Sequence, residues 1–595
     1  MRIGCGSALL LLISEADRGF HIRITSRVFI MFSSADVRAA SAALPTGSGR
    51  GLLRWVSTSN PFYVLSAGLF LAGLWISFGT QYEEVQTWAL MSGLAGYTLL
   101  LAVTACLLVR FGNVWDDVRT LLLLVVLMFL ATSVTFDEVL VFGPARGYFC
   151  YIIGLLFAIG VSEGLLRGIR LALPVLFRVP YYLILSLFFL YPLALRPLLA
   201  DPHGEALLWG LFGFSPIAGV FFLTLLPAIR RGPDYVRDNG SPWCWPLYPW
   251  VLFGVLAFVV PARAFLLCWS MQLLESSEIQ RVLFGPFFAA PFGLAVAVLL
   301  LESGIVAKAR TVQWTALTIP LVLIGLTFFC HRDDPIYRHF LDVFTARVGD
   351  PLSVLLLATA LFFAYAVWRR ISLSSDALTA VLVLLAVVGP NTLDNHELGA
   401  PQSTPFLAAA LLQMALGVEW RHSWRCLAGT VFLIAALVTL PQEVLALFPV
   451  GAVALHLALL SALMIGALFN DVLARLLRLF ASVVILLVCD AVILGRPQVG
   501  ESIPPILLLL YPLVMAALLA GYGRLLGQRF PLPVAFLIVA AWLGMAGWRG
   551  YCWLRQRILG LDHLLVSLAL FALAVLVSLG KAGVLPRRLS ASRQR

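Results

Sequence analysis

Apolar runs about as long as a bilayer is thick recur along nearly the whole chain from Pro61 onward. A membrane-spanning helix needs about 20 mainly apolar residues, and the breaks between these runs are short and carry charges, Gly or Pro. Hydrophobic residues make up 61% of the chain and charged residues 12%, whereas soluble proteins hold about 45–50% and about 25%. No soluble core needs so much apolar surface, so the sequence predicts an all-α polytopic membrane protein.

The breaks in hydropathy place about 18 membrane crossings, and we expect about 16–18 because short segments can merge. Met31 opens a polar stretch rich in Ser and Ala, and we expect translation to begin there, with residues 1–30 a wrongly assigned start. The predicted organisation is a cytoplasmic N-terminal segment (1–59), a first transmembrane repeat (60–310), a second transmembrane repeat (311–530), two additional helices (531–584) and a basic cytoplasmic tail (585–595).

The connections between crossings alternate between basic and acidic. One set carries arginines and the two lysines, and the other carries acidic pairs such as Asp137-Glu138. Basic residues gather on the cytoplasmic side of inner-membrane proteins. The sequence therefore predicts that the chain lies in the inner (plasma) membrane of the cell, with both termini in the cytoplasm. The net charge of +11 is spread along the chain as single residues and pairs. Topology explains that pattern better than nucleic-acid binding, so the one partner we predict is the lipid bilayer.

Polar landmarks of the early crossings recur in the same order between 256 and 259 residues later. The pairs are Leu99 and Leu355, each opening LLLA; Asp117 and Asp376, each followed by Thr three residues on; Asp137 and Asp394, each preceded by Thr two residues earlier; and Gly160 and Gly417. This order favours a tandem duplication of an eight-helix unit with two helices added at the end. An even unit keeps both copies in one orientation, so the repeats would be parallel. The alternative is chance similarity between Leu-rich segments.

The outer ends of the two matched crossings carry the main candidate site. One end holds Asp137 and Glu138, and the other holds Asp394, His396 and Glu397. Carboxylates with a histidine can bind a divalent cation, carry protons or act as a general base. Neither cluster has the spacing of a specific metal site, and short outer loops need polar residues in any case.

Arg263 is a second candidate, because it lies within a predicted crossing. An arginine at that depth is costly unless it reaches the interface or finds a partner. It lies about six residues from the outer end, so we expect its side chain to extend to the membrane surface. Its functional interpretation is a contact with an anion or a lipid headgroup.

The motif search identifies no cofactor and no catalytic signature. The single Gly-Lys lacks P-loop spacing, and HExxH and GxSxG do not occur. The nine cysteines include no CxxC, so they signal neither a zinc site nor a disulfide framework. The short connections leave no room for a soluble nucleotide-binding module, which argues against an ATP-driven pump in a single chain.

Three segments carry a resemblance to known sequences. They are NPFYVLSA from Asn60, VWDDVRT from Val114 and SVTFDE from Ser133. With them the chain resembles a group of uncharacterised bacterial multi-pass membrane proteins over roughly its first third. The resemblance implies a multi-pass fold and carries over no activity and no functional residue.

Three functions remain open from the sequence. Many crossings, short loops and two similar halves favour a secondary transporter or permease. A non-catalytic scaffold or sensor, whose partner carries the activity, fits the same features. A membrane-embedded transferase acting on a lipid-linked substrate at the outer face would use an acidic pair such as Asp137-Glu138. A transporter would hold a water-lined cavity with paired carboxylates, and a scaffold would have a packed interior with charges only at its rims.

Overall fold

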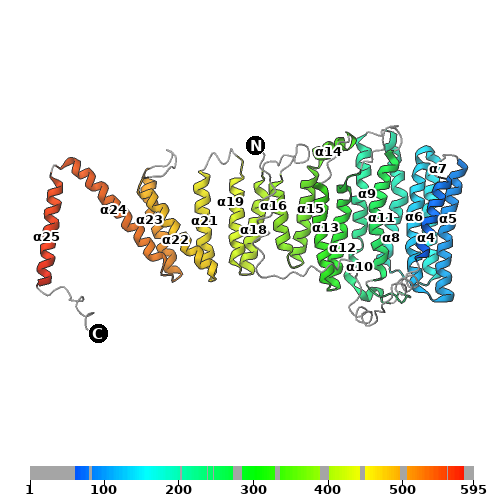
Figure 1. Ribbon diagram of the computed structural model, residues 1–595, viewed down its shortest axis with the longest axis horizontal. Helices are drawn as coiled ribbons and strands as arrows, with labels where there is room; N and C mark the ends of the chain where they lie inside the picture. Colours follow the sequence, from blue (N-terminus) through cyan, green and yellow to red (C-terminus); the bar gives the residue numbers. More distant parts are fainter. Residues whose placement is uncertain are drawn as a thin grey trace, which may run out of the picture. The chain divides into compact units, whose positions relative to one another are not determined.

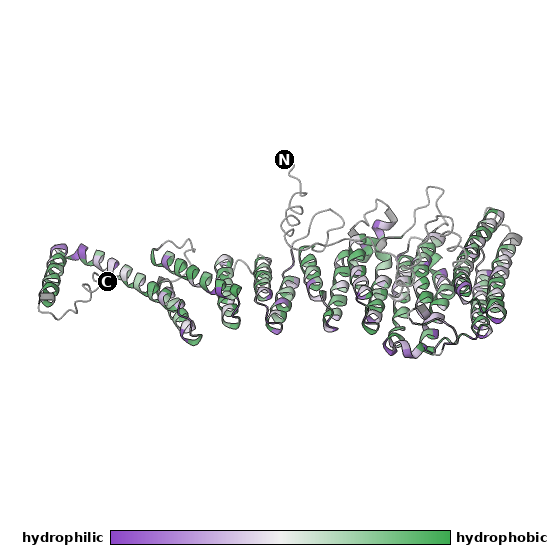
Figure 2. Ribbon diagram, turned by 60° about the horizontal axis from the view of Figure 1, so that its bottom comes forward, coloured by the Kyte–Doolittle hydropathy of each residue, from purple (hydrophilic) through white to green (hydrophobic). Residues whose placement is uncertain are grey.

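The computed structural model shows an all-α protein. Every regular element among the described residues is a helix, which confirms the predicted fold class. The coloured ribbon in Figure 2 shows these helices as mainly hydrophobic along their length. The structure describes residues 61–78, 84–200, 204–237, 239–245, 247–272, 284–328, 335–388, 401–441, 449–495, 505–558 and 560–581.

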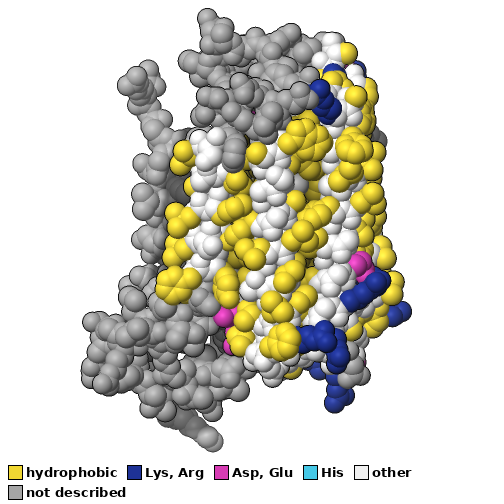
Figure 3. Space-filling view, turned by 90° about the vertical axis from the view of Figure 1, so that its right-hand side faces the viewer, with side chains coloured by type: hydrophobic (Ala, Val, Ile, Leu, Met, Phe, Trp, Pro, Cys, Tyr) yellow, Lys and Arg dark blue, Asp and Glu magenta, His cyan; other side chains and the backbone are white. Residues whose placement is uncertain are grey.

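The helices have the length and composition of membrane spans. Within the described ranges, twelve helices are long and apolar enough to cross a membrane, and five more are apolar over 10–17 residues. A helix lies at the position of each predicted crossing. Figure 3 shows apolar side chains over the middle of the visible helices, with most of the visible Lys and Arg near the lower end. The protein is therefore a multi-pass membrane protein, as predicted.

The chain divides into two units within α6, between Val125 and Val126. In the first unit, Phe70 and Tyr97 stack with ring centroids 4.1 Å apart, and the Tyr97 hydroxyl donates to Ser66 over 3.1 Å. The predicted eight-helix duplication and the domain limits drawn from it stay predictions. The helices of the first unit are α4 (Phe62–Phe78), α5 (Glu84–Leu107), the short η1 (Leu108–Gly112) and the beginning of α6 (Trp115–Phe142).

The second unit begins within α6 and holds the remaining helices (Figure 1). Its next helices are α7 (Pro144–Gly168), α8 (Val175–Leu195), η2 (Arg196–Ala200), α9 (Glu205–Leu223), α10 (Leu226–Arg231), η3 (Pro233–Val236), α11 (Leu247–Gln272), η4 (Pro286–Ala289), α12 (Ala290–Val306), α13 (Arg310–Phe328) and α14 (Pro335–Arg347). They are followed by α15 (Pro351–Trp368), α16 (Ser374–Val387), α18 (Ser403–Glu419), α19 (Ser423–Val438), α21 (Val450–Leu468), α22 (Val472–Ile493), α23 (Pro505–Leu525), α24 (Pro531–Arg557) and α25 (Leu561–Lys581).

Two kinds of packing occur in the second unit. Up to α15, helices meet several others: α12 packs against α9, α13 and α15, and α9 also packs against α8 and α11. From α15 on, each helix packs chiefly on the helices next to it in sequence. Neighbours in sequence are thus neighbours in space over this part of the chain, as Figure 1 shows.

Small residues and helix caps explain several local features. Gly154 on α7 lets α7 approach α6 and α8, since a Cβ there would lie 2.4 Å from Phe136 and 2.9 Å from Phe189. Helix α15 begins with Pro351, preceded by Asp350, whose carboxylate accepts a hydrogen bond from the Ser353 amide. Proline at the first helical position and Asp at the N-cap are both favoured signals for a helix start.

Helix α14 lies between the apolar helices α13 and α15 and is amphipathic. Tyr337, Phe340 and Phe344 lie on its buried face, while Arg338 and His339 are exposed. The buried rings pack into an aromatic cluster contributed by α9 and η4. The charged residues of α14 hid its amphipathic pattern from a search for apolar runs, and that pattern is typical of a helix lying at a membrane surface.

Candidate functional site

A fully buried ion pair joins α6 to α11 in the second unit. Arg263 on α11 donates from Nη1 to Asp137 Oδ2 over 2.5 Å and from Nη2 to Asp137 Oδ1 over 2.8 Å. Neither side chain has any exposed surface. The geometry is the bidentate arrangement in which a planar guanidinium meets a carboxylate, the strongest form of this contact.

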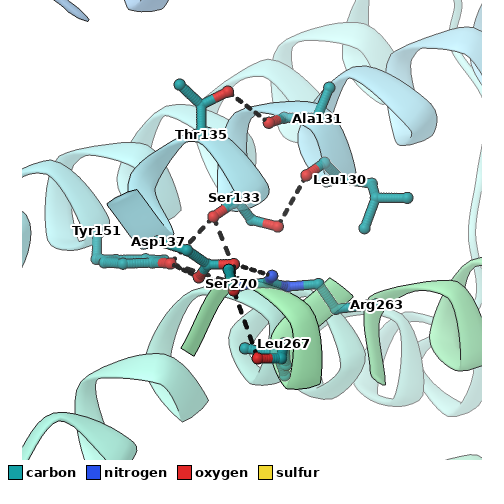
Figure 4. A network of polar contacts seen from close by, with 9 residues as sticks. All are labelled: Leu130, Ala131, Ser133, Thr135, Asp137, Tyr151, Arg263, Leu267 and Ser270. Carbon is teal, nitrogen blue, oxygen red and sulfur yellow. Dashed lines mark hydrogen bonds and ion pairs between the residues drawn. The ribbon is translucent and has the colours of Figure 1, made fainter. Parts of the chain in front are cut away.

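Two hydroxyl groups complete the surroundings of the Asp137 carboxylate (Figure 4). Tyr151 on α7 donates to Oδ1, and Ser270 on α11 donates to Oδ2 over 2.9 Å. The Tyr151 hydroxyl also lies 3.0 Å from the carbonyl of Ser133, one helical turn before Asp137. Each carboxylate oxygen therefore accepts two hydrogen bonds, and three helices meet at one ionised group.

Aromatic rings close one side of this network. Phe136 lies next to Asp137 on α6 and meets Tyr151 edge to face, with ring centroids 5.4 Å apart. Phe189 on α8 contacts both rings, each with a centroid distance of 6.3 Å. Because these rings exclude water from the pair, Asp137 and Arg263 compensate each other's charge with little help from solvent.

One donor of Arg263 is left over. Its Nε is buried and has no hydrogen-bond partner among the residues that the structure describes. Burying a polar N–H without a partner costs free energy. The Nε–H of the guanidinium is therefore an unused donor, while Nη1 and Nη2 donate to Asp137.

The structure corrects the expectation for Arg263. We expected its side chain to extend to the membrane surface, and that prediction is wrong because the guanidinium is fully buried against Asp137. The partner lies 126 residues earlier in the sequence. The anion that Arg263 meets in this structure is a carboxylate of its own chain.

The other predicted site residues are not part of this network. Glu138 follows Asp137 directly, yet its side chain is exposed while that of Asp137 is buried. Glu138 therefore takes no part in the hydrogen-bond network around the Asp137 carboxylate. Asp394, His396 and Glu397 lie outside the described residues.

Sequence reasoning missed Tyr151 and Ser270. The spacing of polar residues within each helix could have indicated part of this network. Ser133 and Asp137 are four residues apart on α6, and Arg263 and Ser270 are seven apart on α11, so each pair shares one helix face. Nothing in the sequence showed that these two faces meet.

A second buried carboxylate lies at the opposite end of the helices. Glu302 on α12 has no exposed side-chain surface. It accepts hydrogen bonds from Arg369 over 3.1 Å, from Arg230 over 3.4 Å and from the Tyr365 hydroxyl. Unlike Arg263, both arginines are partly exposed, at 50% for Arg230 and 32% for Arg369. This cluster ties α10, α12 and α15 together at a rim.

Two further ion pairs lie at helix ends on the same side as Glu302. Glu163 on α7 accepts from Arg178 on α8, and Asp376 on α16 accepts from Arg425 on α19 over 2.8 Å. Each pair holds neighbouring helices together near a connection. Since Arg178 in one pair and Asp376 in the other are partly exposed, these pairs have the character of rim contacts. The Asp137–Arg263 pair differs from them in its complete burial.

Known proteins add no further guide to this site. Comparison with family models, with curated proteins and with solved structures finds no match. Over the described residues, no three His, Cys, Asp or Glu side chains are grouped in a way that could hold a metal ion. The chemistry of the site must be argued from the network itself.

Proposed function

We propose that the protein is a secondary permease in which the Asp137–Arg263 pair couples protonation to the movement of a small anion. The observation that carries this proposal is the complete burial of both charged groups within a membrane-spanning bundle. Ionisable residues inside membrane-spanning segments are rare, and they commonly mark ion, proton or substrate pathways.

The cost of the pair supports a functional role. Burying two charges is expensive, and replacing a buried ion pair by apolar side chains of similar volume is often neutral or stabilising. Helices α6, α7 and α8 already share aromatic contacts beside the pair. A structural role alone would be served more cheaply by leucine and phenylalanine.

The pair is also a two-state element. Protonation of Asp137 removes the negative charge that compensates Arg263, and an unpaired buried guanidinium then requires another anion or movement of α11. The unpartnered Nε of Arg263 gives such an anion a first donor. Coupling a proton to an anion in this way is the behaviour of a proton-linked permease.

Proton-linked flux tests the proposal directly. The purified full chain is placed in liposomes that contain a pH-sensitive dye, and small organic and inorganic anions are added outside one at a time. We expect at least one anion to drive proton entry with the native chain and not with Asp137→Asn. The matched control is Asp342→Asn, the same chemical change at an exposed position on α14. Equal flux in both variants, or no proton movement with any anion, would contradict the proposal.

A non-catalytic membrane component is the second candidate. No residue in the apolar window of α25 is buried by the rest of the described chain. From α15 onward, each helix also packs chiefly on its sequence neighbours. Such helices offer long apolar faces to lipid or to another membrane protein. Removal of residues 559–595 would then abolish co-purification of that partner while proton-linked flux stays unchanged.

The membrane-embedded transferase ranks third. It needs an acidic pair at the outer face, for which the sequence offers Glu83-Glu84 or Asp137-Glu138. In the second pair, both oxygens of Asp137 already accept hydrogen bonds from Arg263, Tyr151 and Ser270, which disfavours its use as a catalytic carboxylate. The inner membrane as location and a cytoplasmic position for both termini rest on the alternation of charge in the connections.

A further inference from the structure

Five helical hairpins of the second unit are joined by the same tight turn. Each turn contains a residue with positive φ just after the first helix ends, and the amide of the following residue bonds to the carbonyl five residues earlier. This is the Schellman motif, in which the left-handed residue is usually glycine. The five left-handed residues are Arg170, Lys308, Arg370, Arg421 and Gly527, with φ of 56°, 51°, 57°, 56° and 63°.

Four of these five turns use a basic residue where glycine would cost less. A left-handed conformation costs an L-residue roughly 1–2 kcal/mol more than glycine. The turn at Gly527 has the same hydrogen bonds as the others, with the Gln528 amide 2.8 Å from the Gly523 carbonyl. Glycine thus satisfies this turn, and the basic side chains must serve something other than the backbone.

All of these turns lie on one side of the membrane if every apolar helix between them crosses once, the shorter α16 and α18 included. Four crossings separate Arg170 from Lys308. They are α8, the span formed by α9 and α10 together, α11, and α12. Two crossings, α13 and α15, separate Lys308 from Arg370, with the amphipathic α14 not counted. Two more, α16 and α18, separate Arg370 from Arg421. An even number of crossings returns the chain to the side from which it started, so the four cations face one leaflet.

The four basic side chains are exposed and free. None of them has a hydrogen bond, ion pair or ring contact with any residue that the structure describes. Other arginines near the same turns are engaged: Arg178 with Glu163, Arg369 with Glu302 and Arg425 with Asp376. Three of the four turns therefore carry one arginine that is paired within the protein and one cation that is exposed and unpaired.

We propose that Arg170, Lys308, Arg370 and Arg421 form a binding surface for the phosphate of anionic phospholipids in the leaflet on their side. Each cation lies at the end of an apolar helix, the level at which lipid phosphates lie in a bilayer. Each carries an uncompensated charge that the headgroup of an anionic lipid neutralises. On α8, the helix that follows the Arg170 turn, Val175, Arg178, Val179, Tyr182, Leu183 and Ser186 line an open and mostly apolar groove that suits an acyl chain.

Lipid retention tests this surface, with glycine as the replacement. The full chain is reconstituted in vesicles that contain phosphatidylcholine with a minor share of phosphatidylglycerol, extracted in mild detergent, and analysed by native mass spectrometry for bound lipid. The variant carries Arg170→Gly, Lys308→Gly, Arg370→Gly and Arg421→Gly. Glycine relieves the left-handed backbone, so the variant folds at least as well as the native chain. Phosphatidylglycerol retention should fall about fivefold for each charge removed, and phosphatidylcholine retention should not change.

A charge-preserving variant completes the experiment. Arg170→Lys, Lys308→Arg, Arg370→Lys and Arg421→Lys keep both the charge and the backbone conformation, and they should keep phosphatidylglycerol bound. Inorganic phosphate added to lipid-free protein should not bind, because the surface takes its phosphate from the bilayer plane. Native retention in the glycine variant would overturn the proposal. Loss of retention in the charge-preserving variant would also overturn it.

Discussion

Arg263 and Asp137 lie 126 residues apart in the sequence and meet through two hydrogen bonds, of 2.5 Å and 2.8 Å, with neither side chain exposed. Their contact joins α11 to α6, and Tyr151 adds α7. The pair is stable only while both charges are present, because each buried charge depends on the other for compensation. Its energetics therefore differ from those of a surface ion pair.

Replacing the two residues singly and together should reveal this dependence. Asp137→Leu or Arg263→Leu alone leaves one buried charge without a partner, and each should lower the free energy of unfolding by about 3–5 kcal/mol. The double variant removes both charges and should cost far less than the sum. Reversible unfolding of the four proteins in mixed micelles measures the coupling. Additive losses would show that the two charges do not depend on each other.

The glycine at position 154 should resist enlargement. In Gly154→Ala, the new Cβ lies 2.4 Å from a Phe136 ring atom and 2.9 Å from a Phe189 ring atom, and both rings are closely packed. We expect the free energy of unfolding to fall by about 1–3 kcal/mol. Gly160→Ala is the control on the same helix, since no atom lies within 4 Å of its Cβ position. Equal unfolding midpoints for the two variants would contradict the packing described for α6, α7 and α8.

The cluster around Glu302 should respond asymmetrically. Glu302→Gln leaves Arg230 and Arg369 without the carboxylate, but both are partly exposed and can turn toward water or headgroups. The double variant Arg230→Gln with Arg369→Gln instead leaves a fully buried carboxylate without cations, which should cost about 3–5 kcal/mol. Unfolding midpoints in detergent should therefore fall further for the double arginine variant. A larger loss for Glu302→Gln would refute this assignment.

Asp471 should make stability depend on pH. It precedes the membrane-spanning part of α22, and the Ser423 hydroxyl, followed by backbone amides, lowers its pKa below the ordinary 3.8 against the opposing effect of burial. A lowered pKa contributes stability that is fully present above 3.8 and lost as the pH falls through the folded value. Asp471→Asn should therefore have a lower melting temperature than the native chain at pH 7, and the gap should close on acidification. A gap independent of pH would rule out this contribution.

Hydropathy was sufficient to locate the helices, because lipid requires each spanning segment to be apolar and to satisfy its own backbone. Hydropathy failed at α14, where the exposed Arg338 and His339 lie between the buried Tyr337 and Phe340. A helix at a surface needs only one apolar face, so its average hydropathy is low.

The candidate site was predicted only in part. The sequence singled out Arg263 because charges are rare within apolar runs. It singled out Asp137 for a different reason, because Asp137 closes a crossing whose landmarks recur about 257 residues later. It assigned Asp137 to an outer loop together with Glu138, whereas α6 continues to Phe142 and turns Asp137 inward. Which helix faces meet is decided by the packing of α6, α7 and α11, and no local pattern contains that information.

Cysteine accessibility tests the central claim, that neutralising Asp137 releases Arg263 and loosens α11. Cys268 lies on α11 between Arg263 and Ser270 and is fully buried, and Cys489 on α22 is a buried reporter of general unfolding. In a background that keeps only these two cysteines, alkylation is timed at one pH for the native chain, Asp137→Asn and Asp342→Asn. The account predicts faster alkylation of Cys268 in Asp137→Asn alone, with Cys489 unchanged. Equal rates at Cys268 in all three proteins would contradict it.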